Sequence, residues 1–200
     1  NREGVWSIFL PDAMYGARLA DGSLYKLHIH GNNGWRDRIP AYAKRVVQDE
    51  TTKNYTAQFV VEQPYDWKHD DFRAPKVGEL LIYEAHVGMA TEKEGVGTYV
   101  EFRDEVLPRI KEAGYNAVQL MAIAEHPYYG SFGYHVSSFF APSSRFGTPE
   151  ELKRLIDTAH GMGIAVIMDL VHAHYVKNQN EGILDLDGSG HHYSKEGEAG

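Results

Sequence analysis

The sequence of 200 residues contains no cysteine. Disulfide bridges and thiolate metal sites are therefore excluded, and the composition is compatible with a reducing compartment, for which we expect a cytoplasmic location. The chain also lacks any apolar run near the roughly 20 residues that a membrane-spanning helix needs. Its first residues, NREGVWSIFLPD, do not have the basic and then apolar layout of a signal peptide. We therefore expect a soluble protein with no membrane partner.

Positive charge is also scarce. Lys and Arg number 20 against 28 Asp and Glu, which gives a formal net charge of −8 without any basic cluster. Nucleic acid is not expected as a partner, because phosphate binding needs concentrated Lys and Arg. A neutral substrate fits this composition better, and the hydrophobic content of 42% is enough for a real core.

The first third of the chain consists of short apolar runs separated by turns. Four residues alternate with polar neighbours, as in a half-exposed strand: Tyr55, Ala57, Phe59 and Val61. The pattern favours an antiparallel β-sandwich that lacks its earlier strands. Residues 63–78 carry two prolines and no periodicity, which is typical of a linker. We expect a partial sandwich over 1–70, a linker over 71–78 and an α/β unit over 79–200.

The α/β unit is predicted from three near-continuous apolar runs separated by helical patterns: 80–88, 116–124 and 164–172. The second helix is well defined, with Thr148 as N-cap, Pro149 at its first position and Glu151 completing a capping box. Gly163 follows its end. The first helix contains Pro108, which must begin a helical segment or kink one. Alternating strands and helices imply parallel strands with right-handed crossovers.

Polar residues follow each of the three apolar runs: Glu84 and His86, then Glu125 and His126, then Asp169, His172 and His174. The carboxyl ends of parallel strands meet at one edge, where ligands bind in barrels and open sheets. A single strand-end histidine or acid is often only structural. The same asymmetry after three strands indicates a site.

Four segments of the chain carry a specific pattern: YEAHVG at 83–88, PRIKEAGYNAVQLMAI at 108–123, FGYHVSSFFAPSSRFGTPEEL at 132–152 and GIAVIMDLVHAH at 163–174. In order and spacing they resemble the 1,4-alpha-glucan branching enzymes of the alpha-amylase clan, in their eukaryotic-type form. The resemblance implies the first three strand–helix units of a TIM-type (β/α)8 barrel. Residues 1–70 resemble the C-terminal part of the carbohydrate-binding β-sandwich that precedes this barrel in the family.

The same resemblance implies roles for three residues. Tyr134 would stack under the sugar in subsite −1, where an aromatic ring suits the apolar face of glucose. Asp169 would hold an arginine near the nucleophile, and His174 would donate a hydrogen bond to the same glucose. His172 has no assigned role. Tyr128 and Tyr129 are candidates for lining the glucan channel, and His86 is a further candidate for binding or supporting the substrate.

The activity implied is cleavage of an α-1,4 bond and transfer of the oligoglucan to a 6-hydroxyl, on glycogen, amylose or amylopectin and without a cofactor. This retaining reaction needs two carboxyl groups about 5 Å apart. In the clan they lie on the fourth and fifth barrel strands, so we expect no catalytic pair in this chain. The chain therefore resembles a segment of a longer enzyme and is expected to be inactive alone.

Two alternatives to a branching enzyme remain at this point. An amylase-type or debranching hydrolase shares the retaining mechanism, and a non-catalytic glucan-binding fragment is supported only by the partial sandwich. A metal site is not expected, because His172 and His174 lack a third ligand at a convincing spacing. His191 and His192 lie in a Gly- and Asp-rich loop that is typical of solvated chain.

Overall fold

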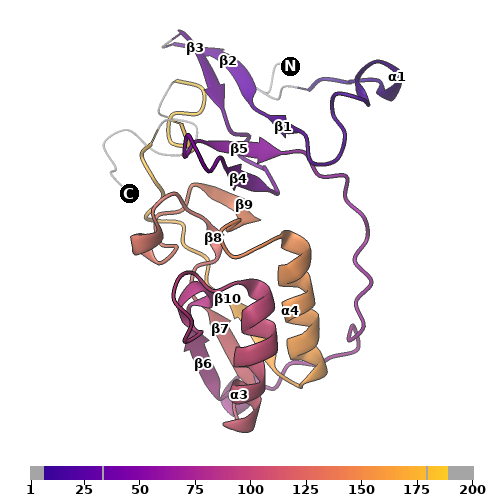
Figure 1. Ribbon diagram of the computed structural model, residues 1–200, viewed down its shortest axis with the longest axis vertical. Helices are drawn as coiled ribbons and strands as arrows, with labels where there is room; N and C mark the ends of the chain where they lie inside the picture. Colours follow the sequence, from indigo (N-terminus) through magenta and orange to yellow (C-terminus); the bar gives the residue numbers. More distant parts are fainter. Residues whose placement is uncertain (1–6, 33, 179, 189–200) are drawn as a thin grey trace.

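The structure is a computed structural model that describes residues 7–32, 34–178 and 180–188, so His191 and His192 lie outside the described residues. Small antiparallel sheets occupy one end, and a parallel sheet with its helices occupies the other (Figure 1). The chain runs from the first part to the second, and after the last strand it returns to the first part (Figure 1). Within these described ranges, no helix is long and apolar enough to cross a membrane.

The parallel sheet consists of β6 (Ile82–Ala85), β7 (Ala117–Leu120) and β10 (Ala165–Met168), in the order β10-β7-β6. Met168, Leu120 and Ala85 are aligned across the three strands. The predicted α/β architecture is confirmed. Each strand is shorter than its apolar run, and residues of these runs outside the strands, such as Val87 and Ile123, are buried in the same core.

The second predicted helix is α4 (Pro149–Gly161), and its capping box is confirmed. The Thr148 hydroxyl accepts from the Glu151 N–H, and the Glu151 carboxylate accepts from the Thr148 N–H. Helix α4 buries Leu152 and Leu155 against the sheet. Its position is therefore set both by its own first turn and by its apolar face.

The first helical segment is irregular near Pro108, where the sequence predicts the start or a kink of a helix. It consists of three consecutive pieces: α2 (Tyr99–Glu101), a π-helical turn η3 (Phe102–Val106) and α3 (Leu107–Glu112). The Leu107 N–H donates to the Phe102 carbonyl, five residues back. Pro108 has no N–H to continue the α-helical ladder, and the wider turn before it absorbs the irregularity.

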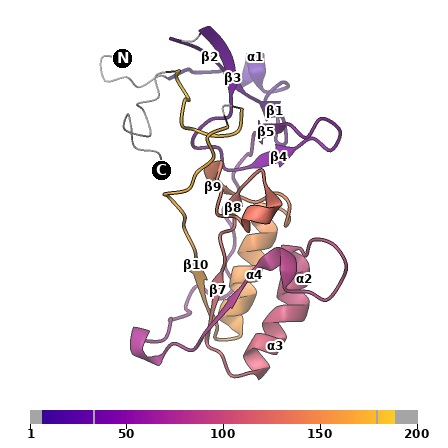
Figure 2. The same cartoon turned by 90° about the vertical axis from the view of Figure 1, so that its left-hand side faces the viewer.

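The two longer helices cover only one face of the sheet (Figure 2). Val118 and Leu120 point into the core that contains them, whereas Gln119 lies on the opposite face, in register with Glu84. That second face carries exposed apolar groups, including Ile82 at 44% exposure. A three-stranded section thus leaves the inner face of a barrel-type sheet open to solvent.

A hairpin connects the two ends of the molecule. Strands β8 (Ala124–Glu125) and β9 (Ser138–Pro142) pair antiparallel with an irregular register, and the loop between them contains the short helix η4 (Tyr129–Ser131). Ala141 of β9 packs into the core of the N-terminal part. A second short helix, η2 (Val87–Met89), follows β6.

The N-terminal part contains a short helix and five strands: α1 (Asp12–Tyr15), β1 (Leu24–Tyr25), β2 (Leu27–Gly31), β3 (Gly34–Arg38), β4 (Val46–Gln48) and β5 (Tyr55–Gln58). They form a sheet of order β1-β5-β4 and the hairpin β2-β3, all antiparallel. Tyr55 and Ala57 are buried as the alternation predicts. The alternation predicted to reach Val61 is wrong beyond Gln58: the Phe59 N–H donates to the Ser23 carbonyl, and the chain then leaves the sheet with Val61 48% exposed.

The linker-like segment 63–78 has no strand or helix before the turn η1 (Val77–Glu79). It is nevertheless fastened to α4. The buried Asp157 carboxylate accepts the backbone N–H groups of Lys68 at 3.1 Å and His69 at 3.0 Å. Burial opposes the charge of Asp157, but these hydrogen bonds lower its pKa overall.

Candidate functional site

The carboxyl ends of the parallel strands place three residues at one level. His86, Met121 and Asp169 each follow the aligned positions that end β6, β7 and β10. The Asp169 N–H donates to the Leu120 carbonyl at 3.3 Å, which extends the strand pairing by one residue. Asp169 is therefore held at the rim by backbone hydrogen bonding.

Tyr134 reaches Asp169 from a loop 35 residues away in sequence. Its hydroxyl donates to Asp169 Oδ2 at 2.8 Å. This bond, together with burial and the charges of Asp169 and Glu84, raises the pKa of Tyr134 to about 12. The phenol consequently remains a donor at any physiological pH, and Asp169 retains its other oxygen, Oδ1, for a further partner.

The backbone before Tyr134 is wound in an unusual way. Phe132 has φ 56°, in the left-handed region, and Gly133 follows with φ 91°. A Cβ on Gly133 would lie 1.8 Å from the Ala122 carbonyl oxygen. Two consecutive left-handed residues and this close approach turn the chain so that Tyr134 faces Asp169, and such local strain is frequent at functional sites.

Glu84 and Gln119 lie on the open face of the same sheet. The Gln119 amide donates to the Glu84 carboxylate at 3.0 Å. Both residues lie on the face toward which the centre of a barrel would form. Glu84 thus contributes negative charge near Tyr134 from inside the sheet, as its effect on the pKa of that tyrosine indicates.

His86 is placed beneath the edge instead of on it. It is 7% exposed, and its ring makes edge-to-face contacts with Tyr129, Phe132 and Phe146. Burial lowers its pKa, so the neutral imidazole is favoured. The structure therefore gives His86 a packing position under the loop that carries Tyr134.

The prediction that all strand-end polar groups lie at the open edge is wrong for Glu125 and His126. Both are fully buried. The Glu125 carboxylate accepts the N–H groups of Ser144 at 2.8 Å and His126 at 3.1 Å, so it organises its own hairpin. Burial raises the pKa of Glu125 despite these bonds, and burial likewise lowers the pKa of His126 to about 4.

Arg145 was not singled out in the sequence, although it lies in the SSR part of the quoted segment. Its guanidinium donates to the Tyr55 hydroxyl at 3.1 Å and to the carbonyls of His126 and Pro127 at 3.4 and 3.3 Å. It also lies over the Tyr129 ring, with 5.5 Å between its central carbon and the ring centre. Tyr129 is thereby packed against the hairpin, and its hydroxyl donates to the Gly88 carbonyl.

The remaining predicted residues lie on the surface. His172 is exposed and stacks on Phe139 with ring centres 5.9 Å apart, and Tyr128 is 63% exposed with its ring near His135. His174 is exposed, and the described part of the chain offers it no hydrogen bond or ring contact. The structure thus joins Tyr134 to Asp169, while the roles of His174, His172 and Tyr128 stay predictions.

Metal-ligating side chains do not converge in the part of the chain that the structure describes. No group of three or more His, Asp or Glu residues there has the arrangement of a metal site. The chemistry available at the edge is consequently that of a carboxylate, a phenol donor and an aromatic ring.

Known proteins of one class share this fold. Residues 89–182 match the family model of the alpha amylase catalytic domain. A crystal structure of a candidate alpha amylase from Salmonella typhimurium is similar with a TM-score of 0.66 and 25% identity, over 78% of this chain and 25% of that one. The GBS pullulanase SAP, solved with maltotetraose, is similar in fold with a TM-score of 0.57 and 22% identity, over 72% of this chain and 24% of that one. The chain thus has the α/β, TIM-barrel-type fold of alpha-amylase catalytic domains.

Curated relatives with higher sequence identity point to one family within this class. The chain is 50% identical to 1,4-alpha-glucan-branching enzyme 2-2 of Arabidopsis thaliana, over 100% of this chain and 25% of that protein. It is 47% and 49% identical to the 1,4-alpha-glucan-branching enzymes of Yarrowia lipolytica and Dictyostelium discoideum, over 98% of this chain and 29% of each. The chain is homologous over its whole length to a segment of the 1,4-alpha-glucan-branching enzymes, eukaryotic ones included. It spans between 25% and 29% of the length of these relatives.

Proposed function

We propose that the protein to which this chain belongs is a 1,4-alpha-glucan branching enzyme. It would cleave α-1,4-glucosidic bonds and transfer the oligoglucan to a 6-hydroxyl, with glycogen, amylose or amylopectin as partner. The observation that carries this proposal is identity of about half, over essentially the whole chain, to three proteins of that name. The acidic net charge of −8 is consistent with a neutral substrate.

The described site supports a binding and positioning role for this segment. Tyr134 offers a ring whose orientation is fixed by its bond to Asp169. A rigid aromatic face can stack on the C–H face of glucose at little entropic cost. In the proposed enzyme, Asp169 would use its remaining oxygen to orient a cation near the nucleophile, and His174 would contact the same sugar.

The reaction itself would use residues beyond these three strands. A retaining transfer requires one carboxylate that attacks the sugar and a second carboxyl group that first donates and then accepts a proton. We assign neither role to Asp169 or Glu125. Glu125 is fully buried in its hairpin and does not face the edge, and the family resemblance gives Asp169 a supporting role beside the nucleophile.

The N-terminal part would be the end of a carbohydrate-binding β-sandwich. The proposed boundaries are 1–70 for this module, 71–78 for a linker and 79–200 for the start of the barrel. The antiparallel sheet β1-β5-β4 supports a β-rich module. Its core includes Ala141 from the hairpin of the barrel-type part, so the two parts pack against each other.

An amylase-type hydrolase is a second candidate, favoured by the match of residues 89–182 to the alpha amylase catalytic domain. The two candidates differ in whether water or a sugar hydroxyl accepts the glycosyl group. Linkage analysis of the products of the complete enzyme on amylose separates them. New α-1,6 linkages support the branching enzyme, whereas short linear products without branches support the hydrolase.

The 200-residue chain alone is expected to show no turnover of amylose, because the two catalytic carboxyls would be missing. Its open inner face should also make it prone to aggregate. Measurable branching or hydrolysis by the purified chain would contradict the assignment of both carboxyls to later strands.

A cytoplasmic location is part of the proposal and is supported by the absence of cysteine. The Arabidopsis thaliana relative is named as chloroplastic or amyloplastic, so the compartment needs its own measurement. Cell fractionation with an antibody to the protein provides it.

A further inference from the structure

The loop 126–137, which joins β8 to β9 and carries Tyr134, is fastened at its beginning by one cation. The Arg145 guanidinium donates to the backbone carbonyls of His126 and Pro127, at 3.4 and 3.3 Å. These two residues come directly after β8, where the chain leaves the hairpin. The direction in which the loop starts is therefore set by side-chain donors on the far side of β9.

Arg145 also holds the loop further along, at η4. Its guanidinium lies over the ring of Tyr129, the first residue of η4, with 5.5 Å between its central carbon and the ring centre. The Tyr129 hydroxyl donates to the Gly88 carbonyl at 3.2 Å. Tyr129 is thus held between the cation and the segment that follows β6.

Backbone hydrogen bonds extend this hold from η4 to Tyr134. The Phe132 N–H donates to the Tyr129 carbonyl, and the Tyr134 N–H donates to the Ser131 carbonyl, both at 3.0 Å. The left-handed residues Phe132 and Gly133 lie inside this stretch. A displacement of Tyr129 would consequently be transmitted to Tyr134, since the residues between them are bonded to one another.

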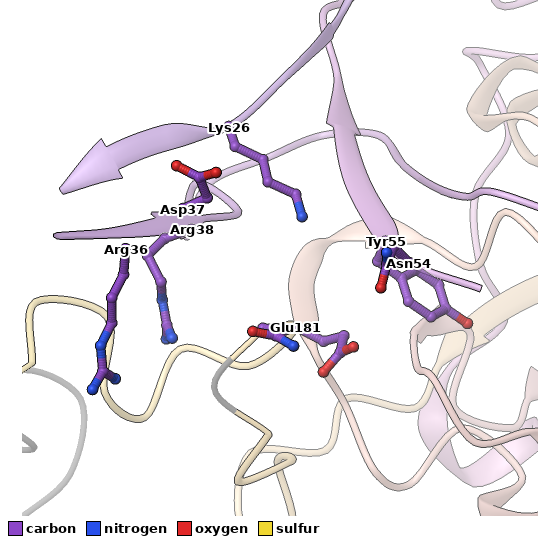
Figure 3. Close-up of a pocket in the computed structure, with 8 residues that line it drawn as sticks. Lys26, Arg36, Asp37, Arg38, Asn54, Tyr55 and Glu181 are labelled. Carbon is purple, nitrogen blue, oxygen red and sulfur yellow. The ribbon is translucent and has the colours of Figure 1, made fainter. Parts of the chain in front are cut away.

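A further partner of Arg145 comes from the N-terminal part of the molecule. The guanidinium donates to the Tyr55 hydroxyl at 3.1 Å, and that hydroxyl donates onward to the His126 carbonyl at 3.4 Å. Tyr55 belongs to β5 and is 4% exposed, so packing fixes its ring. Figure 3 shows Tyr55 beside a pocket lined by Lys26 and Arg38, with its hydroxyl directed away from both. A buried side chain of the N-terminal sheet therefore supports the cation that holds the loop.

Arginine suits this position because its planar guanidinium presents several N–H donors in a rigid fork. One group here serves two carbonyls, a hydroxyl and an aromatic face. A lysine ammonium keeps the charge, but it is a compact donor on a flexible stem and cannot hold partners on both sides at once. The charge also acts on the neighbouring carboxylate: burial raises the pKa of Glu125, and Arg145 opposes that rise.

We propose that Arg145 is a positioning residue for Tyr134. It holds the start of the loop and Tyr129, and the loop then presents the Tyr134 ring at the rim. Through Tyr55, the N-terminal part contributes to the same placement without touching the rim. That the ring receives an α-glucan rests on the proposed function.

The test is a double-mutant cycle on the complete enzyme with amylose as substrate. Turnover is followed by the loss of iodine staining, which both branching and hydrolysis cause. Arg145→Lys should lower kcat/KM by roughly tenfold, as expected for the loss of one charge-assisted hydrogen bond. In a Tyr134→Ala background it should have no further effect, because the ring that it positions is absent. An equal fold loss in both backgrounds overturns the proposal, since a merely structural role would act in both.

Matched variants test the two ends of the network. Arg109→Lys, on α3 with a side chain 54% exposed, should leave kcat/KM unchanged. Tyr55→Phe removes only the hydroxyl and should lower kcat/KM by about threefold, again only while Tyr134 is present. Its control is Tyr99→Phe, which removes a buried hydroxyl that donates to a backbone carbonyl at 3.3 Å. If Tyr55→Phe and Tyr99→Phe have equal effects, the N-terminal part has no share in the placement.

Amide hydrogen exchange provides a readout that does not need activity. Arg145→Lys should speed exchange in the segment 128–136 and leave α4 unchanged. Unchanged exchange in this segment, or a kcat/KM equal to that of the parent, overturns the proposal.

Linkage analysis of the products separates this inference from the proposed function. An enzyme that cleaves amylose without forming α-1,6 linkages, and still shows the coupling to Tyr134, supports the role of Arg145 and counts against branching. A complete protein without any turnover also counts against the proposed function, and exchange in the segment 128–136 then decides the role of Arg145.

Discussion

The hairpin β8-β9 and the rim above β10 each contain a carboxylate that follows an apolar run, and the two carboxylates have different environments. Glu125 is fully buried, and its donors are the N–H groups of His126 and Ser144 and the Ser143 hydroxyl, which belong to the hairpin or to the two residues that follow it. Asp169 is half-buried and receives a side-chain hydroxyl from a distant loop. The donors of Glu125 all come from residues close to it in the fold. Asp169, in contrast, keeps one carboxylate oxygen, Oδ1, available for a further partner.

The difference shows that position after a strand does not by itself define a site. Donors supplied by residues next to the hairpin fix local structure, and they do so whether or not a ligand is present. Donors supplied by a side chain such as Tyr134 couple the carboxylate to a surface that a ligand can reach. The two carboxylates should therefore respond to substitution in opposite ways.

The largest effects are expected from Glu125→Ala and Asp169→Ala in the complete enzyme. Glu125→Ala should lower the free energy of unfolding by about 3 to 5 kcal/mol, since it leaves a cavity and two buried N–H groups without acceptors. Asp169→Ala should reduce kcat/KM by roughly a thousandfold, about 4 kcal/mol of transition-state stabilisation, and should lower stability less than Glu125→Ala because Asp169 is half-buried and accepts one described side-chain hydrogen bond. Urea unfolding and steady-state branching assays measure the two quantities.

Isosteric variants are the controls for this pair. Glu125→Gln keeps an acceptor oxygen in place and should retain near-normal stability, whereas Asp169→Asn keeps the shape, loses the charge and should stay nearly inactive. Similar losses of stability for both alanine variants would show that the contrast between the two regions is wrong.

Gly133→Ala should destabilise the protein by about 3 kcal/mol, because the added Cβ meets a backbone carbonyl and φ is positive. Gly114→Ala is the matched control: its φ is 86° and nothing lies within 4 Å of the added Cβ. It should cost only about 1 kcal/mol. Equal effects at the two glycines, measured by thermal or urea unfolding, would remove the argument that close packing positions Tyr134.

Sequence patterns predicted those parts of the molecule that local rules determine. The capping box at Thr148, the kink at Pro108 and the parallel order of the sheet all follow from short-range chemistry and hydrophobic period. The end of β5 at Gln58 was missed because it depends on where the chain leaves the sheet, which alternation does not record. The contrast between Glu125 and Asp169 was missed because both follow apolar runs.

Long-range contacts explain most of what the sequence could not indicate. The family resemblance assigns separate roles to Tyr134 and Asp169. Only the fold shows that a hydrogen bond joins the two side chains, which are 35 residues apart in sequence. The buried Arg38 guanidinium donates to the Gly182 carbonyl across 144 residues of sequence. No local pattern marks either encounter, since each depends on the packing of complete elements.

The pH dependence of stability provides a third test of the buried region. His126 has a folded pKa of about 4, below its ordinary value of about 6.5, because of burial. Between these values the unfolded state binds a proton that the folded state does not, so stability is lost as pH falls through this window. The contribution of His126 to the free energy of unfolding should decrease by about 2 kcal/mol from pH 7 to pH 5.

The measurement compares urea unfolding of the parent protein and of His126→Asn at several pH values. The ring nitrogen Nδ1 lies 2.9 Å from the Ala124 carbonyl, and an asparagine amide can donate in its place. The variant is expected to be less stable at pH 7 and to show a flatter pH profile. Parallel profiles for the two proteins would mean that His126 titrates normally.

The smallest effect is expected at the rim, for Tyr134→Phe. Phenylalanine retains the ring that would stack on glucose and loses the hydroxyl that donates to Asp169 Oδ2 at 2.8 Å. A half-buried hydrogen bond to a carboxylate contributes about 1.5 kcal/mol, so kcat/KM should fall by roughly tenfold. Tyr134→Ala removes the ring as well and should cost far more. Because the pKa of Tyr134 is about 12, the hydroxyl is protonated throughout the assay range, and the ratio of parent to Tyr134→Phe activity should not vary between pH 6 and pH 9. A ratio that changes with pH in that interval would show that the hydroxyl takes part in proton transfer instead of holding the ring. Equal losses of kcat/KM in the phenylalanine and alanine variants would show that Tyr134 acts through its hydrogen bond to Asp169 and not through stacking on the sugar.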